Sequence, residues 1–288
     1  MPAELLDPAL LARLERLQLT TRRRLAGLHA GEHRSPRTGS SLDFADYRDY
    51  HPGDDFRRID YHLYARLGTL LVKLFDAEDD LTLRLVIDRS ASMGLGGKLD
   101  MAKRLAAALG FVALLRRDVV TLTAFPGGGP PARFVSRTAA GHLFDRLAEL
   151  DAAGATPIAA AVADLLSRPG PTGSTVLISD LLTPDWRDGV RRLPARGGDV
   201  TVVHVLDRAE LEPSLVGDLE LVDVETGERV QVSLAPDTLA RYRRAAQAWA
   251  DEIAGQVRRA GAGYLRVFAD DDLERLLTST WRAEGVLR

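Results

Sequence analysis

The chain has 288 residues, 45% of them hydrophobic and 27% charged, with a formal net charge of -3 at pH 7 and no cysteine. This composition is typical of a globular protein, and it excludes disulfides, thiolate zinc sites and cysteine nucleophiles. The small negative charge gives no reason to expect nucleic acid as a partner. The sequence begins without a signal-peptide pattern and contains no apolar stretch long enough for a membrane span, so we expect a cytoplasmic protein.

The N-terminal part of the chain is polar and only partly periodic. Residues 8–29 place leucines at helical spacing and predict an amphipathic helix. The segment 42–61 follows neither the helical nor the strand period and interleaves aspartates with arginines. We interpret this segment as a salt-bridged structural network beneath aromatic side chains. A second metal site at Asp54, Asp55 and Asp60 is the alternative.

Apolar strands and amphipathic helices alternate through the middle of the chain. Strands are predicted at 70–75, 83–87, 119–125, 175–178 and 199–206, and helices at 98–115, 139–150, 157–166 and 186–193. Helices placed regularly between apolar strands indicate parallel pairing with helices on both faces of the sheet. The predicted fold is therefore α/β, a doubly wound and mostly parallel sheet of Rossmann type.

The alternation stops after residue 207. A hairpin is predicted at 219–224 and 229–234, followed by a helix at 237–259, a strand at 264–268 and a helix at 271–277. We expect this hairpin and the segment 43–66 to form an accessory β layer. The predicted organisation is an N-terminal helical segment (1–30), a polar and aromatic accessory segment (31–80), the α/β core (81–207), and the hairpin with a C-terminal helix-strand-helix (208–288).

Five oxygen-bearing side chains are candidates for one metal site. Asp88, Ser90 and Ser92 stand at alternate positions directly after a buried strand, so their oxygens can converge. Asp180 follows another strand and Thr156 precedes a helix, and ligands collect where loops leave the C-terminal ends of parallel strands. Taken singly, Asp180 is a solvated strand end and Thr156 a helix cap. Together the five predict a site for a hard divalent cation such as Mg²⁺.

These five residues resemble the metal-ion-dependent adhesion site of von Willebrand factor A-type domains. A second resemblance, from about residue 39 to the C-terminus, is to the bacterial family called domain of unknown function fifty-eight (DUF58). It is carried by Tyr47-Arg48-x-Tyr50-x-Pro52-Gly53-Asp54-Asp55-x-Arg57-Arg58-Ile59-Asp60, by Ala65-Arg66 and by Asp223-x-Glu225-Thr226-Gly227-Glu228. Two positions depart from the patterns: Tyr61 stands where the family often has tryptophan, and Arg89 replaces a glycine that is frequent in adhesion-site loops.

The resemblance implies a protein-binding module. It implies that Mg²⁺, with Mn²⁺ or Ca²⁺ as alternatives, is held by the five residues and takes an Asp or Glu of a partner protein as its last ligand. Relatives are often encoded beside MoxR-type AAA+ ATPases, which implies a role in the assembly or maturation of other proteins. We do not predict an enzyme, because a hydrolase needs a positioned base or a second metal, and His204 is expected in the core.

Two other functions are weighed against this one. A metal-dependent phosphohydrolase using Asp88 also places an aspartate after a first strand, but such enzymes commonly carry a second acid where this chain has Ser90. A nucleotide-binding loop at Gly94-Leu95-Gly96-Gly97-Lys98 does not fit, because Leu99 stands where a P-loop requires Ser or Thr. We expect these glycines to let the loop turn from the site into the next helix.

Overall fold

The computed structural model describes two compact units, one formed by residues 26–81 and one by residues 1–25 and 82–288. The described residues are 5–15, 44–51, 54–75, 82–127, 129–155, 158–168, 170, 173–215 and 217–277.

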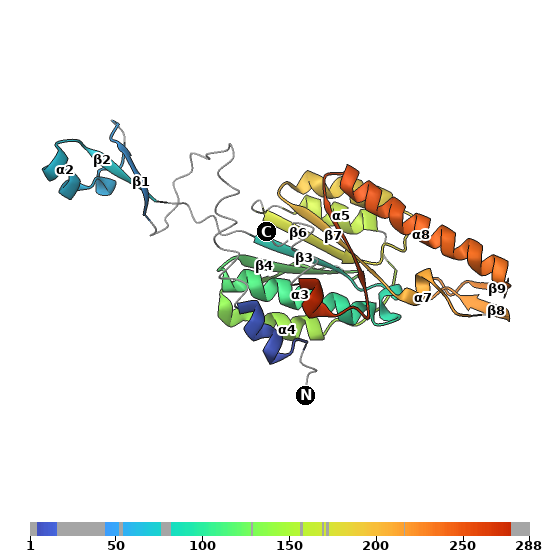
Figure 1. The fold of residues 1–288 in the computed structure, drawn as a ribbon. Coiled ribbons are helices and arrows are strands. Elements are labelled where there is room, and N and C mark those ends of the chain that lie inside the picture. Colours follow the sequence, from blue (N-terminus) through green and yellow to red (C-terminus); the bar gives the residue numbers. More distant parts are fainter. Residues whose placement is uncertain are drawn as a thin grey trace. The chain divides into compact units, whose positions relative to one another are not determined.

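The larger unit is built on a six-stranded sheet with the strand order β10-β7-β6-β3-β4-β5 (Figure 1). Its strands are β3 (Thr82–Asp88), β4 (Val119–Phe125), β5 (Ala132–Phe134), β6 (Gly173–Ser179), β7 (Val200–Leu206) and β10 (Gly263–Phe268). All neighbours pair in parallel except β5, a short edge strand antiparallel to β4. The predicted α/β fold with a mostly parallel sheet is confirmed.

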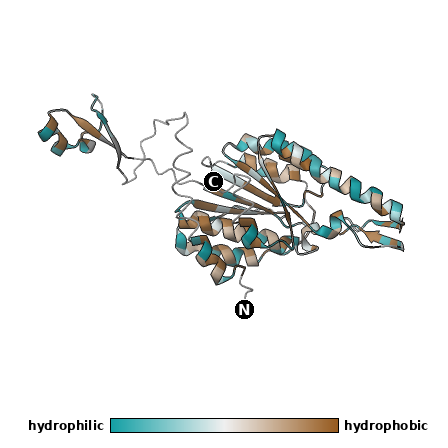
Figure 2. Cartoon of the chain, in the orientation of Figure 1, coloured by the Kyte–Doolittle hydropathy of each residue, from teal (hydrophilic) through white to brown (hydrophobic). Residues whose placement is uncertain are grey.

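Helices cover both faces of this sheet (Figure 1). One face carries α3 (Lys98–Leu115) and α4 (Ala140–Ala148), and the other carries α5 (Ile158–Ser167), α6 (Trp186–Arg192) and α8 (Pro236–Arg259). Each face of the sheet has its own hydrophobic core, the first beneath α3 and α4 and the second beneath α5, α6 and α8. Because successive strand residues point to opposite faces, Leu85 and Ile87 of β3 belong to the first core and Val86 belongs to the second. The central strands are accordingly hydrophobic over most of their length, as Figure 2 shows.

The N-terminal helix is present over residues 8–15, where Leu10 and Leu14 are buried in the first core. This confirms the first part of the helix predicted at 8–29. The rest of that prediction, from residue 16 onward, lies outside the described residues.

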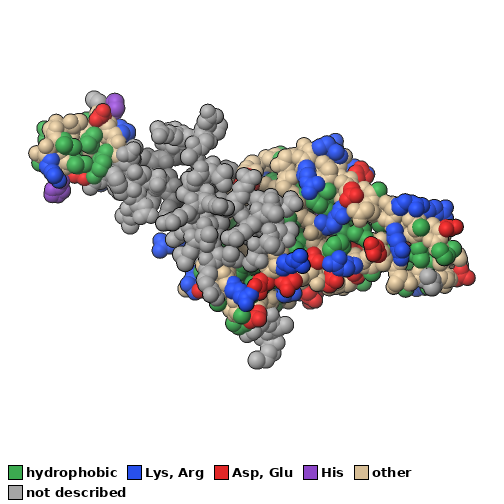
Figure 3. Space-filling model, viewed as in Figure 1, with side chains coloured by type: hydrophobic (Ala, Val, Ile, Leu, Met, Phe, Trp, Pro, Cys, Tyr) green, Lys and Arg blue, Asp and Glu red, His purple; other side chains and the backbone are tan. Residues whose placement is uncertain are grey.

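The chain after β7 forms a hairpin and a long helix. The elements here are α7 (Arg208–Leu211), the antiparallel pair β8 (Gly217–Val222) and β9 (Arg229–Leu234), and α9 (Leu273–Arg275). Hydrophobic side chains are exposed toward the far end of the hairpin (Figure 3); they are Leu221, Val222, Val224 and Val230. Among the helices that the structure describes, none combines the length and the apolar character that crossing a bilayer requires.

The smaller unit pairs β1 (Phe44–Asp49) antiparallel with β2 (Leu71–Phe75) and connects them through η1 (Phe56–Arg58) and α2 (Tyr61–Leu67). Within the described ranges, the sheets β1–β2 and β8–β9 each contain two strands. The segment 43–66 and the hairpin, expected to form one accessory layer, therefore belong to two separate sheets.

The aspartates of the smaller unit are engaged in local structure. The Arg48 guanidinium bonds both carboxylate oxygens of Asp54 at 2.6 and 2.7 Å and, with the His51 N–H, lowers the pKa of Asp54 to about 2. Asp55 accepts the Arg57 N–H as the cap of η1. Asp60 caps α2 and accepts the hydroxyl of Tyr47. These contacts fit the structural network that the sequence predicts.

Candidate functional site

The candidate site lies where β3 and β6 end side by side at the centre of the sheet. Chain connections lead from β3 to β4 on one side and later to β6 on the other, so this is the point where the strand order reverses. Ligands of open α/β sheets bind outside the carboxyl ends of the strands at such a point. The parallel register sets Ile87 against Ile178, which brings the next residues, Asp88 and Ser179, next to each other.

Asp88 is an almost completely buried carboxylate. It is 3% exposed and accepts two hydrogen bonds, from the Ser90 N–H at 2.9 Å and from the Ser179 hydroxyl at 2.6 Å. Burial raises the pKa of Asp88 to about 6; the two serine contacts oppose this shift and the nearby charge of Asp180 adds to it. A buried carboxylate with so few donors carries a desolvation cost that a cation beside it would relieve.

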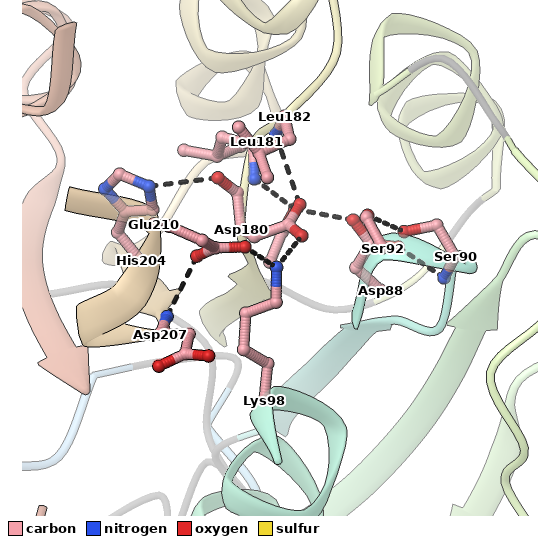
Figure 4. A network of polar contacts seen from close by, with 11 residues as sticks. Asp88, Ser90, Ser92, Lys98, Asp180, Leu181, Leu182, His204, Asp207 and Glu210 are labelled. Atoms are coloured by element: carbon pink, nitrogen blue, oxygen red, sulfur yellow. Dashed lines mark hydrogen bonds and ion pairs between the residues drawn. The ribbon is translucent and has the colours of Figure 1, made fainter. Parts of the chain in front are cut away.

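Ser90 and Ser92 bring their hydroxyls to the same place. Both side chains are buried, and their Oγ atoms lie 3.1 Å apart (Figure 4). Ser92 opens η2 (Ser92–Gly94), and Ala91 between them donates its N–H to the Gly154 carbonyl at 2.8 Å. The structure thus gathers the three residues of the first loop, as their alternate spacing predicts.

Asp180 follows β6 and is also buried. Its Oδ1 accepts the Leu182 N–H at 3.1 Å, and its Oδ2 accepts from the Lys98 ammonium at 2.8 Å. Lys98 is fully buried and forms a second ion pair with Glu210 (Figure 4). Burial lowers the pKa of Lys98, but Asp180 and Glu210 together raise it by more than burial lowers it. The net shift of the pKa is upward, so the ammonium is charged. The candidate site therefore contains a fixed cation that the sequence pattern does not indicate.

Thr156 lies outside the described residues, so its place relative to the other four is not described. The loop that leads to it is described as far as residue 155 and turns at Gly154, whose φ is +74°. After Thr156 in the chain, the first turn of α5 is capped by Asp185. The Asp185 carboxylate accepts the N–H groups of Ile158 and Ala159 at 3.2 and 3.0 Å.

Arg89, to which the sequence assigns no role, ties three loops together. Its Nε donates to the Pro126 carbonyl at 2.8 Å and its terminal nitrogen to the Asp151 carbonyl at 2.7 Å. Its own peptide groups add bonds to Phe125 and Ala153. The Arg89 guanidinium therefore holds the loop after β3 against the loops at 125–127 and 150–154, and so positions the neighbouring site residues.

His204 is a core residue whose ring contacts the backbone carbonyl of Asp180. It is fully buried, its Nε2 lies 3.0 Å from the Asp180 carbonyl, and its Nδ1 lies 2.8 Å from the Tyr264 hydroxyl. Because a carbonyl can only accept, Nε2 carries the proton and Nδ1 accepts from Tyr264. Burial lowers the pKa of His204 to about 3, so the ring is neutral at physiological pH. With both nitrogens engaged, His204 supports Asp180 and does not offer a general base.

The donor set fits a hard divalent cation. Asp88, Ser90 and Ser92 carry buried oxygens in one connected group, and the buried Asp180 follows the neighbouring strand; oxygen ligands of this kind suit Mg²⁺. Across the described ranges, no three His, Asp or Glu side chains gather closely enough to hold a metal by themselves. An ion bound at this place would therefore depend on the hydroxyl groups of Ser90 and Ser92 as well as on the carboxylates.

Sequence reasoning missed three residues of the site: Ser179, Lys98 and Glu210. Ser179 could have been recognised, because it ends the same strand that Asp180 follows. Glu210 belongs to a capping box, Asp207-x-x-Glu210, that opens α7 and is visible in the sequence as a helix signal. Nothing local indicates that Lys98 reaches Asp180 and Glu210, which are 82 and 112 residues away in the chain.

Comparisons with known proteins add the following similarities. The family model described as "Protein of unknown function DUF58" matches residues 46–252. Uncharacterized proteins of Mycobacterium tuberculosis and Mycobacterium bovis are each 32% identical over 277 residues, which cover 92% of this chain and 87% of the relative. A crystal structure of "conserved hypothetical protein BatB" from Bacteroides thetaiotaomicron is 15% identical with a TM-score of 0.43, covering 72% of this chain and 99% of that one. An aerotolerance-related membrane protein from Bacteroides fragilis is 19% identical with a TM-score of 0.43, covering 72% and 96%.

Proposed function

The chain belongs to the DUF58 family, and we propose that it is a metal-dependent protein-binding module. In this proposal the α/β unit is a von Willebrand factor A-like domain with a metal-ion-dependent adhesion site. Asp88, Ser90, Ser92, Thr156 and Asp180 hold Mg²⁺, with Mn²⁺ or Ca²⁺ as alternatives. A partner protein supplies an Asp or Glu carboxylate to the metal.

One observation carries the proposal: Asp88, Ser90, Ser92 and Asp180 lie together, buried, where β3 and β6 end. Burial that raises the pKa of a carboxyl, here that of Asp88 to about 6, is common at functional sites. A bound divalent cation would stabilise the ionised form of Asp88. Because the hydroxyl ligands are neutral, such an ion would keep part of its charge and attract a carboxylate from outside the chain.

The residues of the chain have distinct tasks in this proposal. Asp88 and the two serines come from one loop, and Ser179 fixes the rotamer of Asp88 by donating to its Oδ2. Arg89 holds that loop in place through the Pro126 and Asp151 carbonyls. Hydrogen bonds from these surroundings set the geometry before the ion arrives, and such supporting contacts are what orient ligands in metal sites.

The proposed partner is a MoxR-type AAA+ ATPase, and the proposed process is the assembly or maturation of other proteins. Both come from the resemblance described above. The partner can be tested with the purified MoxR-type ATPase of the same genome, captured on the immobilised chain in Mg²⁺ buffer. We expect capture by the unchanged chain and loss of capture by Asp88→Ala.

The design keeps Mg²⁺ present throughout, because the ATPase needs its own metal. Asp164→Ala, which removes an exposed carboxylate on α5, is the matched control and should bind like the unchanged chain. Equal capture by the Asp88→Ala variant would contradict the proposal. If neither the unchanged chain nor the Asp164→Ala control captures the ATPase, this ATPase is not the partner. The metal site is then tested by direct metal binding.

A metal-dependent phosphohydrolase is the second candidate, favoured by the raised pKa of Asp88, because general acids and bases work best when they titrate near the operating pH. A panel of phosphate esters with Mg²⁺ separates the two functions. Turnover that disappears in Asp88→Asn would establish the enzyme, and absence of turnover with retained partner binding would establish the module.

A further inference from the structure

Lys98 places a positive charge inside the proposed metal site. Its ammonium lies 2.8 Å from Asp180 Oδ2 and also pairs with Glu210, and the side chain is fully buried (Figure 4). Ion pairs of this kind are costly to desolvate, and replacing them by apolar groups is often neutral or stabilising. Fold stability alone therefore does not explain why a cation is held against a candidate metal ligand.

The surrounding backbone fixes where this ammonium lies. Lys98 begins α3 directly after Gly96 and Gly97, whose φ values are +59° and +77°. A Cβ on Gly96 would clash with the Asp207 carboxylate, so the glycine loop packs directly against the start of α7. On that side, Glu210 Oε2 accepts the Asp207 N–H at 2.9 Å, which leaves its other oxygen for Lys98. The backbone at the start of α3 and the start of α7 thus fixes the positions of Lys98 and Glu210 relative to each other.

Resting on the metal site proposed above, we propose that Lys98 is a built-in counter-cation that sets the affinity of this site for its divalent ion. Lys98 takes up part of the negative charge of Asp180, so a divalent ion competes with the ammonium for that carboxylate. Glu210 acts in the opposite sense, because it takes up part of the charge of Lys98. The Lys98–Glu210 pair therefore sets the affinity of the site for a divalent ion, although neither residue is a metal ligand.

The consequence is a site whose occupancy responds to the concentration of the free ion. A counter-cation that weakens binding of every divalent ion raises the concentration at which the site fills. Lys98 acts in this way without changing which ion is preferred, because that choice follows from the ligands and from metal availability.

Two substitutions that break the same ion pair should shift metal affinity in opposite directions. Lys98→Met removes a positive charge near the metal position and should tighten Mn²⁺ binding by about tenfold or more. Glu210→Gln leaves Lys98 without its second partner and should weaken Mn²⁺ binding by a similar factor. The double variant Lys98→Met/Glu210→Gln removes one charge of each sign and should return to within about threefold of the unchanged chain.

The test is isothermal titration of MnCl₂ into the full chain after removal of metal, with far-UV circular dichroism on each variant. Lys103→Met is the matched control: Lys103 is also a buried lysine of α3, but its ammonium lies 3.5 Å from the Ala148 carbonyl. This control should bind Mn²⁺ with unchanged affinity.

The outcomes separate the inference from the function on which it rests. If the unchanged chain binds no Mn²⁺, the proposed metal site fails. If it binds Mn²⁺ and the two single variants shift affinity in the same direction, or neither shifts it, the role of Lys98 is overturned, because a purely structural pair would behave in that way. If Lys98→Met does not fold, Glu210→Gln must weaken binding and the double variant must restore it; any other result overturns the inference.

Discussion

Asp88→Asn should make the metal-free protein more stable at neutral pH, although it removes a candidate metal ligand. The Asp88 carboxyl titrates at about 6 in the folded protein, against 3.8 for the free side chain. Between these values the folded state binds the proton more tightly than the unfolded state, so stability falls as the pH rises. Each pH unit is worth about 1.4 kcal/mol, which makes the ionised Asp88 cost on the order of 3 kcal/mol above pH 6.

Asparagine avoids this cost and loses one favourable contact. Its amide can still accept the Ser90 N–H, but it disturbs the bond from the Ser179 hydroxyl, a loss of about 1 kcal/mol. The net expectation is a gain of about 2 kcal/mol at neutral pH. Near pH 4 Asp88 is itself mostly protonated in the fold, so the gain should disappear and the loss of the Ser179 bond should leave the variant slightly less stable than the unchanged chain.

Urea unfolding in EDTA, at neutral pH and around pH 4, measures this difference. With excess Mg²⁺ the unchanged chain should become more stable, because the ion binds only the folded state, whereas Asp88→Asn should not respond. Asp164→Asn on α5 is the control for an exposed carboxylate and should change stability by less than about 0.5 kcal/mol. An Asp88→Asn protein that is less stable than the unchanged chain in EDTA at neutral pH would refute the assignment of Asp88 as a carboxylate buried at a cost.

Three further substitutions probe the supports of the site. Gly96→Ala should lower the free energy of unfolding by about 1 to 3 kcal/mol, because φ is +59° and the new Cβ meets the Asp207 carboxylate; urea unfolding without any loss would contradict the packing described. Asp185→Ala should cost about 1 kcal/mol and speed amide exchange in the first turn of α5, whose N–H groups it caps. Arg89→Ala should cost about 1 to 2 kcal/mol and weaken Mn²⁺ binding several-fold, since it releases the loop of the site; unchanged binding would leave Arg89 with a structural role only.

Much of the α/β unit could be predicted from the sequence, because its elements carry strong local patterns. The helix at Lys98–Leu115 and the strand at Val119–Phe125 have the predicted bounds, and the other core strands begin or end within a few residues of their predicted ends. Apolar runs of β-branched residues and regular helical spacing are the signals that decide here. The grouping of Asp88, Ser90, Ser92 and Asp180 follows from them, because parallel strands bring their carboxyl ends to one edge.

Two of the missed elements are strands that depend on pairing with another segment of the chain. The strand β1 (Phe44–Asp49) contains three charged residues and is defined by its pairing with β2, and β5 (Ala132–Phe134) has three residues and is defined by β4. Their sequences lack the periodic apolar signal that local reasoning uses. The predicted final helix at 271–277 begins two residues later in the structure, where α9 covers Leu273–Arg275 and a π-helical stretch continues over residues 276–277.

The predicted site is incomplete for the same reason. The sequence presents Lys98 only as the end of a glycine-rich loop, and that loop does turn the chain into α3, with Gly96 and Gly97 in the left-handed region. What the loop delivers, a buried ammonium against Asp180 and Glu210, depends on tertiary contacts between residues far apart in the sequence. A pairwise ionic contact of this kind has no local signature, so it becomes visible only when the fold is known.

The metal site is tested most directly by a crystal of the metal-free chain soaked in MnCl₂ and measured near the manganese absorption edge. We expect one strong anomalous peak between Asp88, Ser90, Ser92 and Asp180, and none at this place in Asp88→Ala. Absence of the peak from crystals of the unchanged chain that have taken up Mn²⁺ elsewhere would contradict this expectation.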